Sequence, residues 1–392
     1  MRHPHYARAM TAVWVVQFMA LSSCYLMLVL PRILSQQAID VSWQGWIMAT
    51  FNFAFLIGSL VCGRAVERRG YRLPALLGCS AIIAGCLLYS AGRYGVPWYF
   101  AARWLHGFGV GIVLLAWQNR VVVIAQPEQR GRALGMTNLL GFVALAISPL
   151  IAEGMQRVGE NNVVFFTAAA LCVPVLPLAM RLPALPVVHQ ASLAEGVDRF
   201  SIPECAVLIL ILAHGAAISS TQLLLPLITG GKQSWSFSGF FLAYGMTCVW
   251  VRLWLEPYLH RRVHPLAMVA SVCLMPAAAV LLVFAHMTVA FAGIGVLFGL
   301  AHGLYFPCTV QIITRAAAPH QIVSRIAKVS AMGVVGLMLG ECGAGLLARY
   351  AGVRTTLGIV GVSLAMLQIL TLLPISRGTR ATGHSTRTHE RV

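Results

Sequence analysis

A few ionisable side chains interrupt the long apolar runs of this sequence, and their types could do chemistry. Glu341 and Arg103 each lie inside such a run, as do His106, His214 and His302. A low-dielectric interior disfavours the charged form of a carboxyl or imidazole group, which suits a group that takes up and releases protons. These residues therefore favour proton handling or solute binding inside a membrane.

Each of these residues also has a structural interpretation. Glu341 lies among the glycines of GLMLGECGAG, where a carboxyl group can be hydrogen-bonded between closely packed helices. A buried neutral histidine is commonly satisfied by a backbone carbonyl, and Arg103 follows Trp98, which marks a membrane interface to which an arginine can snorkel. The amides of Asn119 and Gln311 could line a cavity or bond neighbouring helices. Both interpretations stay open here.

The elements that must hold these residues are membrane-spanning helices. Apolar residues make up 59% of the 392-residue chain and charged residues 10%, and the mean hydropathy is +0.80. Crossing a bilayer takes about 20 apolar residues. The sequence therefore predicts an all-α integral membrane protein with twelve transmembrane helices, near 9–31, 46–63, 73–92, 97–124, 133–153, 162–180, 204–229, 237–255, 265–285, 288–314, 326–348 and 355–375.

The strong positive charge follows from the orientation of these spans. The chain has 28 Lys and Arg against 11 Asp and Glu, yet it offers no long soluble stretch with a basic face, so we exclude nucleic acid as a partner. Most of the basic residues fall on one side when both termini are placed in the cytoplasm. We expect a multi-pass protein of the inner (plasma) membrane, with anionic lipid headgroups against its basic loops.

Other readings of the sequence are weaker. The N-terminal apolar run continues through YLMLVL beyond the signal-peptide-like LSSC, which favours an uncleaved first span. The ten cysteines lie inside spans without a CxxC pair, so we expect neither disulfides nor a metal site. The sequence has no phosphate-binding Walker loop and no nucleophile elbow, so we expect no enzyme activity and no cofactor.

The chain divides into two related halves. A Pro-rich stretch, 183–203, is expected to be a cytoplasmic loop between six-helix halves at 1–182 and 204–375, and 376–392 is expected to be a disordered basic cytoplasmic tail. A shift of about 192 residues carries Gly107 onto Gly299, Gly111 onto Gly303 and Asn119 onto Gln311. Such internal symmetry is typical of secondary transporters, whose substrate site lies between the halves.

The loop after the second span, GRAVERRGYR, resembles the signature Gly-x-x-x-Asp-Arg-x-Gly-Arg-Arg/Lys of the major facilitator superfamily. Gly63, Glu67, Arg68, Gly70 and Arg72 match it, with Glu in place of the commoner Asp, and Tyr71 departs from it. The resemblance implies the fold of that superfamily and a conformational latch at these five residues. We expect Gly63 to permit close helix approach and Gly70 a tight reversal of the chain.

Two further segments extend or limit this resemblance. RWLHGFG is similar to the superfamily's Arg-x-x-Gln-Gly-x-Gly, with His106 in the Gln position, and this likeness implies a proton-coupling role for Arg103. The fifth span, ALAISPLIAE, keeps only Pro149 of the glycine-rich motif of antiporter-type exporters. The antiport signature is therefore not supported.

Together these features predict a secondary active transporter that acts as a monomer. The expected activity is proton-coupled efflux of a small neutral or anionic amphipathic solute by alternating access, and protons and that solute are its expected partners. Two alternatives are a proton-coupled importer of an organic acid or similar nutrient and a non-transporting membrane sensor. The sensor is disfavoured because no soluble signalling domain is evident in the sequence.

Overall fold

The computed structural model describes residues 4–126, 130–181, 202–229, 236–255, 265–315 and 322–389, which form helices and no strand. In chain order, the elements are α1 (Pro4–Leu26), η1 (Met27–Val29), α2 (Leu30–Gln36), α3 (Val41–Arg69), α4 (Arg72–Leu88), η2 (Tyr89–Tyr94), α5 (Val96–Ile124), α6 (Arg130–Val158), α7 (Asn161–Cys172), α8 (Val175–Arg181), α9 (Ile202–Thr229), α10 (Ser238–Trp250), the π-helix η4 (Val251–Leu255), α12 (Pro265–Phe284), α13 (Thr288–Arg315), α14 (Ile322–Ala351) and α15 (Val353–His389).

The described helices are long and apolar enough to confirm a multi-pass membrane protein. Eleven of them meet the length and composition of a membrane span, and a twelfth apolar segment, Val269–Phe284 within α12, is shorter. All twelve fall on the segments predicted from hydropathy. The predicted central loop, 183–203, lies almost entirely outside the described residues, so the proposed boundary between the halves stays a prediction.

The predicted pseudo-symmetry is visible in the way the helices pack. In the first half α3 and α4 both pack on α5, and in the second half α10 and α12 both pack on α13. Gly107 and Gly299, which the repeat relates to each other, lie at equivalent helix contacts. A Cβ on Gly107 would lie 2.2 Å from the Phe51 carbonyl oxygen, and a Cβ on Gly299 would lie 2.6 Å from the Tyr244 carbonyl oxygen. These glycines let α5 and α13 approach their neighbours closely.

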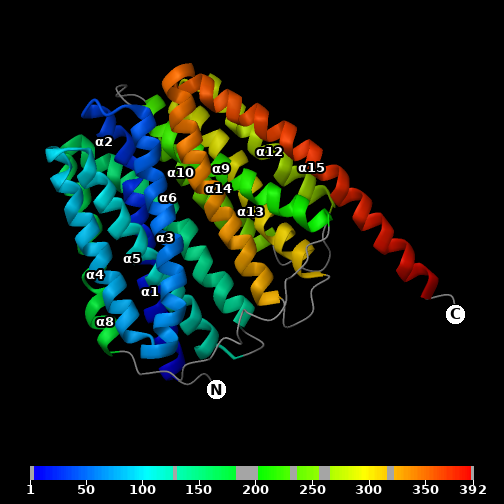
Figure 1. Ribbon diagram of the computed structural model, residues 1–392, viewed down its shortest axis with the longest axis horizontal. Coiled ribbons are helices and arrows are strands. Elements are labelled where there is room, and N and C mark those ends of the chain that lie inside the picture. Colours follow the sequence, from blue (N-terminus) through cyan, green and yellow to red (C-terminus); the bar gives the residue numbers. More distant parts are fainter. Residues whose placement is uncertain are drawn as a thin grey trace.

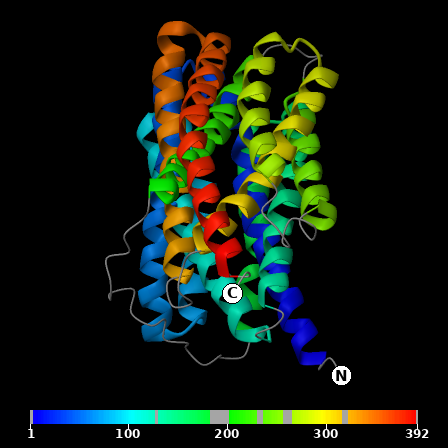
Figure 2. The same cartoon turned by 90° about the vertical axis from the view of Figure 1, so that its right-hand side faces the viewer.

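The two halves meet along two symmetry-related helix pairs, α3 with α14 and α10 with α6. Figure 1 shows α3 and α14 close together at the top of the view and separated at the bottom. The lower end carries the α3–α4 turn, with the exposed Arg64, Arg68 and Arg69, and we call it the basic end. Figures 1 and 2 both place the N-terminus and the end of α15 toward this side.

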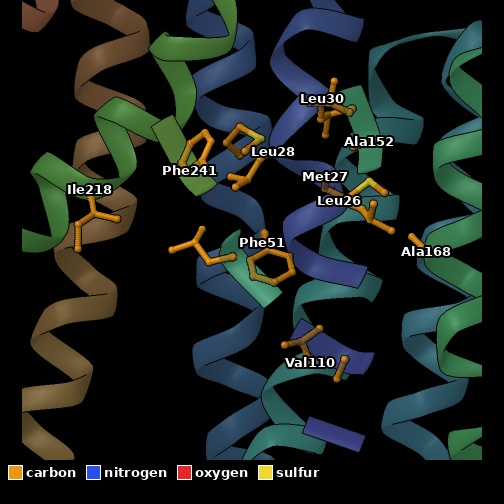
Figure 3. Close-up of a cluster of buried hydrophobic side chains, with 14 of the residues drawn as sticks. Leu26, Met27, Leu28, Leu30, Phe51, Val110, Ala152, Ala168, Ile218 and Phe241 are labelled. Atoms are coloured by element: carbon orange, nitrogen blue, oxygen red, sulfur yellow. The ribbon is translucent and has the colours of Figure 1, made fainter. Parts of the chain in front are cut away.

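One continuous apolar core joins the helices of both halves. Its buried members include Phe51 and Val110 of the first half and Ile218 and Phe241 of the second. Figure 3 shows these side chains reaching between the helices of the two halves. The van der Waals packing of large apolar groups where the halves meet helps to hold them together in this conformation.

The C-terminal segment differs from the expected disordered tail. Helix α15 continues from the last span to His389, and Figure 1 shows this end projecting away from the bundle. The segment after Pro374 contains no further proline. A helix that already exists adds one hydrogen bond for each further residue, so the span can propagate into a polar sequence that would not start a helix itself.

Candidate functional site

A cavity of about 410 Å³ lies between the halves, and Arg103, His214, His302 and Glu341 all line it. Its wall is built by α1, α3, α5 and α6 of the first half and by α9, α10, α13 and α14 of the second. The volume falls in the range of small-molecule sites, about 300–1,000 Å³. Most lining side chains are apolar, and most of the polar groups belong to two clusters; Tyr25, Gln222 and Ser330 line the cavity outside them.

The first cluster, which we call the charged site, consists of Arg103, Glu341 and Asn52. The amide nitrogen Nδ2 of Asn52 on α3 donates a hydrogen bond of 2.8 Å to Oε2 of Glu341 on α14, so this bond joins the two halves. Only 3% of the surface of Arg103 and 2% of that of Glu341 are exposed. The positive charge of Arg103 acts on the Glu341 carboxyl group. An amide donor and a nearby cation both favour the ionised carboxylate, so the protonation of this group depends on whether they stay close to it.

Arg103 is held in place by α3. Its Nη2 donates to the Met48 carbonyl oxygen at 3.5 Å, and its guanidinium carbon lies 4.7 Å from the centre of the Phe51 ring. A cation over an aromatic face is stabilised electrostatically, which offsets part of the cost of burial. The side chain is therefore buried at the cavity wall, and snorkelling to the membrane interface is not what the structure shows.

The second cluster, which we call the aromatic site, consists of His214, His302, Tyr244, Tyr305 and Phe142. The rings of His214 and Tyr305 are stacked, with centroids 3.9 Å apart and planes at 6°. His302 meets His214 edge-on at 5.3 Å, and its Nδ1 is hydrogen-bonded to the Tyr244 hydroxyl group. Phe142 of the first half contacts His302 edge-on at 5.4 Å. Except for Phe142, this cluster belongs to the second half.

The other predicted coupling residues do not line the cavity. His106 is fully buried within the first half, where Nε2 pairs with the Ser23 hydroxyl group and Nδ1 with the Tyr89 hydroxyl group, both at 3.3 Å. This is the satisfied core histidine of the structural interpretation. Asn119 and Gln311 lie farther along α5 and α13 than the lining residues of those helices. A coupling role for these three residues stays a prediction without support from the cavity.

The signature turn joins α3 to α4 at the basic end. Gly70 ends α3 with φ of 69°, a left-handed conformation that favours glycine, so the expected tight reversal is present. The close helix approach expected at Gly63 is absent from this conformation, because a Cβ there would meet no described atom within 4 Å. Arg68 and Arg72 are exposed, and the side chain of Glu67 lies outside the described residues. The latch stays a prediction.

Tyr71 departs from the superfamily signature, and its packing indicates a structural role in the turn. The side chain is 8% exposed and belongs to a small apolar cluster with Cys62, Val66 and Ile112. Burial raises the pKa of its hydroxyl group, which therefore stays neutral. Tyr71 anchors the turn onto α3 and α5.

The end opposite the basic end holds a polar network that sequence reasoning missed. Arg32 Nη1 of α2 donates to Glu153 Oε1 of α6 at 3.3 Å, and Nη2 donates to the Thr229 hydroxyl oxygen of α9 at 3.0 Å. Glu153 also accepts from the Ser236 hydroxyl group and, at 3.2 Å, from the Ser238 backbone N–H that begins α10. We call these five residues the Glu153 network. They connect the two halves.

Signals for part of this network were present in the sequence. Glu153 is one of only 11 acidic residues, and Arg32 is a basic residue at the end of the first span. Their separation by 121 positions hides the pairing. The aromatic residues Phe142, Tyr244 and Tyr305 carried no signal, because aromatic side chains are common in apolar spans.

Comparisons with known proteins agree with this architecture. The sequence model described as Major Facilitator Superfamily matches residues 13–290. An uncharacterized MFS-type transporter of Mycobacterium tuberculosis, Rv1250, is 27% identical over 183 residues, which cover 45% of this chain and 31% of that protein. A facilitated trehalose transporter, Tret1, of Bombyx mori is 30% identical over 148 residues, covering 38% of this chain and 28% of the relative. The matches thus span about a third or less of these relatives.

Solved structures extend the likeness to the whole bundle. A mutant of the nucleoside transporter NupG superimposes with a TM-score of 0.80 at 13% identity, covering 93% of this chain and 99% of that one. The human organic anion transporter MFSD10 gives 0.67 at 16% identity, covering 94% and 100%. At these identities the likeness shows the fold alone. Since the family model matches well over half of the sequence, the chain belongs to the Major Facilitator Superfamily of transporters.

Proposed function

We propose that this protein moves a small neutral or anionic amphipathic solute across the inner (plasma) membrane by alternating access, and that it works as a proton-coupled exporter. The observation that carries the proposal is the cavity between the halves, whose charged site draws Asn52 and Arg103 from one half and Glu341 from the other. A site shared by both halves must change when the halves rearrange, which is what coupling requires.

The charge distribution of the bundle supports one orientation in the membrane. We place the basic end in the cytoplasm, because clustered arginines favour the cytoplasmic face. Along α14 the cavity wall reaches from Glu341 to Val329, about 18 Å toward the basic end. At the other end the Glu153 network joins the halves, and Gly45 and Gly345 bring α3 and α14 into contact. The described conformation is then inward-open.

In the proposed cycle Glu341 carries the proton. In the inward-open state a solute enters from the cytoplasm and replaces the Asn52–Glu341 contact or binds to Arg103. The halves then rock, the Glu153 network breaks, and the basic end closes. A buried carboxyl group that meets different surroundings in the two states changes its proton affinity between them, and this difference couples proton flow to solute flow.

The charge of the solute decides the sign of this coupling. A neutral solute that donates a hydrogen bond to the Glu341 carboxylate competes with the proton, which gives exchange and hence export. An anionic solute that pairs with Arg103 leaves Glu341 without its counter-charge and favours its protonation. Proton and anion then move together, which gives uptake of an organic acid. The charged site therefore supports this importer as the second candidate function.

The experiment is solute flux in proteoliposomes loaded with a metabolite mixture, with and without an imposed proton gradient, followed by mass spectrometry of both compartments. We expect neutral solutes to leave the cytoplasmic-side compartment as protons enter it. Accumulation of anions together with protons would support the importer. Movement of no compound under either condition would contradict transport and favour the sensor.

A further inference from the structure

The aromatic site contains polar atoms that the protein itself leaves without partners. His214 is 4% exposed, yet neither Nδ1 nor Nε2 has a hydrogen-bond partner among the described residues. The hydroxyl group of Tyr305, which is 3% exposed, likewise has none. Buried polar groups are almost always hydrogen-bonded, because an unsatisfied donor or acceptor loses its bonds to water without replacement.

Other polar groups of the aromatic site do have hydrogen-bond partners within the protein. His302 and Tyr244 are hydrogen-bonded to each other on the same side of the cavity. The unpartnered atoms belong to His214 and Tyr305, which line the cavity and stack face to face. Stacking fixes the orientation of both rings, so their polar edges are held in place before any ligand arrives.

The described contacts of the His214 ring are with uncharged rings, Tyr305 and the imidazole of His302. Arg103 and Glu341 line the cavity from α5 and α14, whereas the wall formed by His214 and Tyr305 comes from α9 and α13. Arg252 of η4 lies next to the aromatic site, with its guanidinium carbon 6.0 Å from the centre of the Phe142 ring, and does not line the cavity. A neutral imidazole offers one donor and one acceptor, and a phenol can do both. The donors and acceptors of His214 and Tyr305 therefore suit an uncharged polar group of a solute better than an ion.

We propose that His214 and Tyr305 form a recognition subsite for an uncharged hydroxyl or amide group of the transported solute, separate from the charged site. This inference rests on the proposed transport function and deepens it. A solute that lacks the group leaves the polar edges of both rings buried and unpaired. The subsite therefore selects solutes that carry this hydroxyl or amide group over otherwise similar solutes that lack it.

The test uses pairs of neutral compounds that differ by one hydroxyl or amide group, with the full-length protein. Binding is measured as ligand-induced thermal stabilisation of purified protein, and transport as flux into proteoliposomes. Wild type should prefer the polar member of a pair by about tenfold or more. Tyr305→Phe removes one oxygen atom and should reduce this preference. His214→Phe keeps a stacking ring but no nitrogen and should abolish it.

Two further variants distinguish recognition from general damage. His214→Gln retains a donor and an acceptor and should recover part of the preference. Ser80→Ala removes an exposed hydroxyl group of α4, outside the cavity lining, and should leave the preference as in wild type. Unchanged preference in both Tyr305→Phe and His214→Phe would overturn the subsite, as would a wild type that binds no member of any pair. Selective binding without flux would uphold the subsite and contradict the transport function.

Discussion

Two buried carboxylates in this bundle have contrasting surroundings. Glu153 accepts from Arg32, from a serine hydroxyl group and from the backbone N–H at the start of α10, so its charge is compensated on several sides. Glu341 accepts from Asn52 at a cavity wall, with Arg103 as its nearby cation. The first arrangement favours a fixed charge that holds the halves together. The second suits a group that changes its protonation.

Replacing Glu341 by Gln should uncouple solute movement from protons. Glutamine keeps the size of the side chain and can still bond Asn52, but it cannot be ionised. Downhill flux should therefore continue, while accumulation driven by a proton gradient should be lost, as measured by flux at several gradients. Glu341→Asp keeps the carboxyl group and should retain gradient-driven movement. Normal pH dependence in Glu341→Gln would remove Glu341 from the mechanism.

Replacing Glu153 by Gln should shift the protein away from the described conformation. The variant loses the ion pair with Arg32, and a hydrogen bond to a charged group contributes about 1.5–3 kcal/mol, or roughly tenfold or more in the conformational equilibrium. Hydrogen exchange should rise in α2 and at the start of α10. Glu160→Gln, at an exposed residue of the same end, is the matched control and should show no change. Equal exchange in both variants would argue against the network.

Among the elements, α3 carries the contact that brings the halves together. A Cβ on Gly45 would lie 2.4 Å from the Glu341 carbonyl oxygen and 3.1 Å from the Gly345 Cα atom, whereas one on Gly63 would meet nothing within 4 Å. The same helix therefore has one end packed tightly against α14 and the other end open. Alanine substitutions at Gly45 and Gly63 therefore compare a packed and an open position on the same helix.

Gly45→Ala should destabilise the packed end by about 1–3 kcal/mol, because the added methyl group meets the backbone of α14 rather than a movable side chain. Gly63→Ala should be neutral or stabilise α3 by up to about 1 kcal/mol, because alanine is the better helix former. Thermal unfolding and hydrogen exchange at the start of α3 would measure both. Equal destabilisation by the two substitutions would contradict the packing difference.

The turn between α3 and α4 carries the proposed latch. Glu67→Gln should alter the rate of transport more than the affinity for solute, because the residue lies in the last turn of α3, far from the cavity lining. Initial rates over a range of solute concentrations separate the two quantities. An unchanged maximal rate would count against the latch, and Glu160→Gln serves again as the control at the opposite end.

At the scale of the whole molecule, the symmetry of the halves explains why the cavity lies where it does. Two similar six-helix units meet along α3 with α14 and α10 with α6, and the cavity occupies the space that these contacts leave. Polar groups of the two units then face each other without belonging to one local segment. Small changes in how the units pack can therefore open either end.

The sequence by itself determined the membrane-spanning helices and the family, because hydropathy and signature residues are properties of contiguous segments, and its repeat spacing predicted the division into halves. It also singled out Arg103, Glu341, His214 and His302, since a polar group in an apolar span is costly unless it faces a cavity or a partner. Only the tertiary structure decided which polar residues share a site. It placed His106 in a satisfied core and paired Asn52 with Glu341, 289 positions away. The physical reason is that side-chain partners depend on how whole helices rotate and pack, which no local pattern encodes.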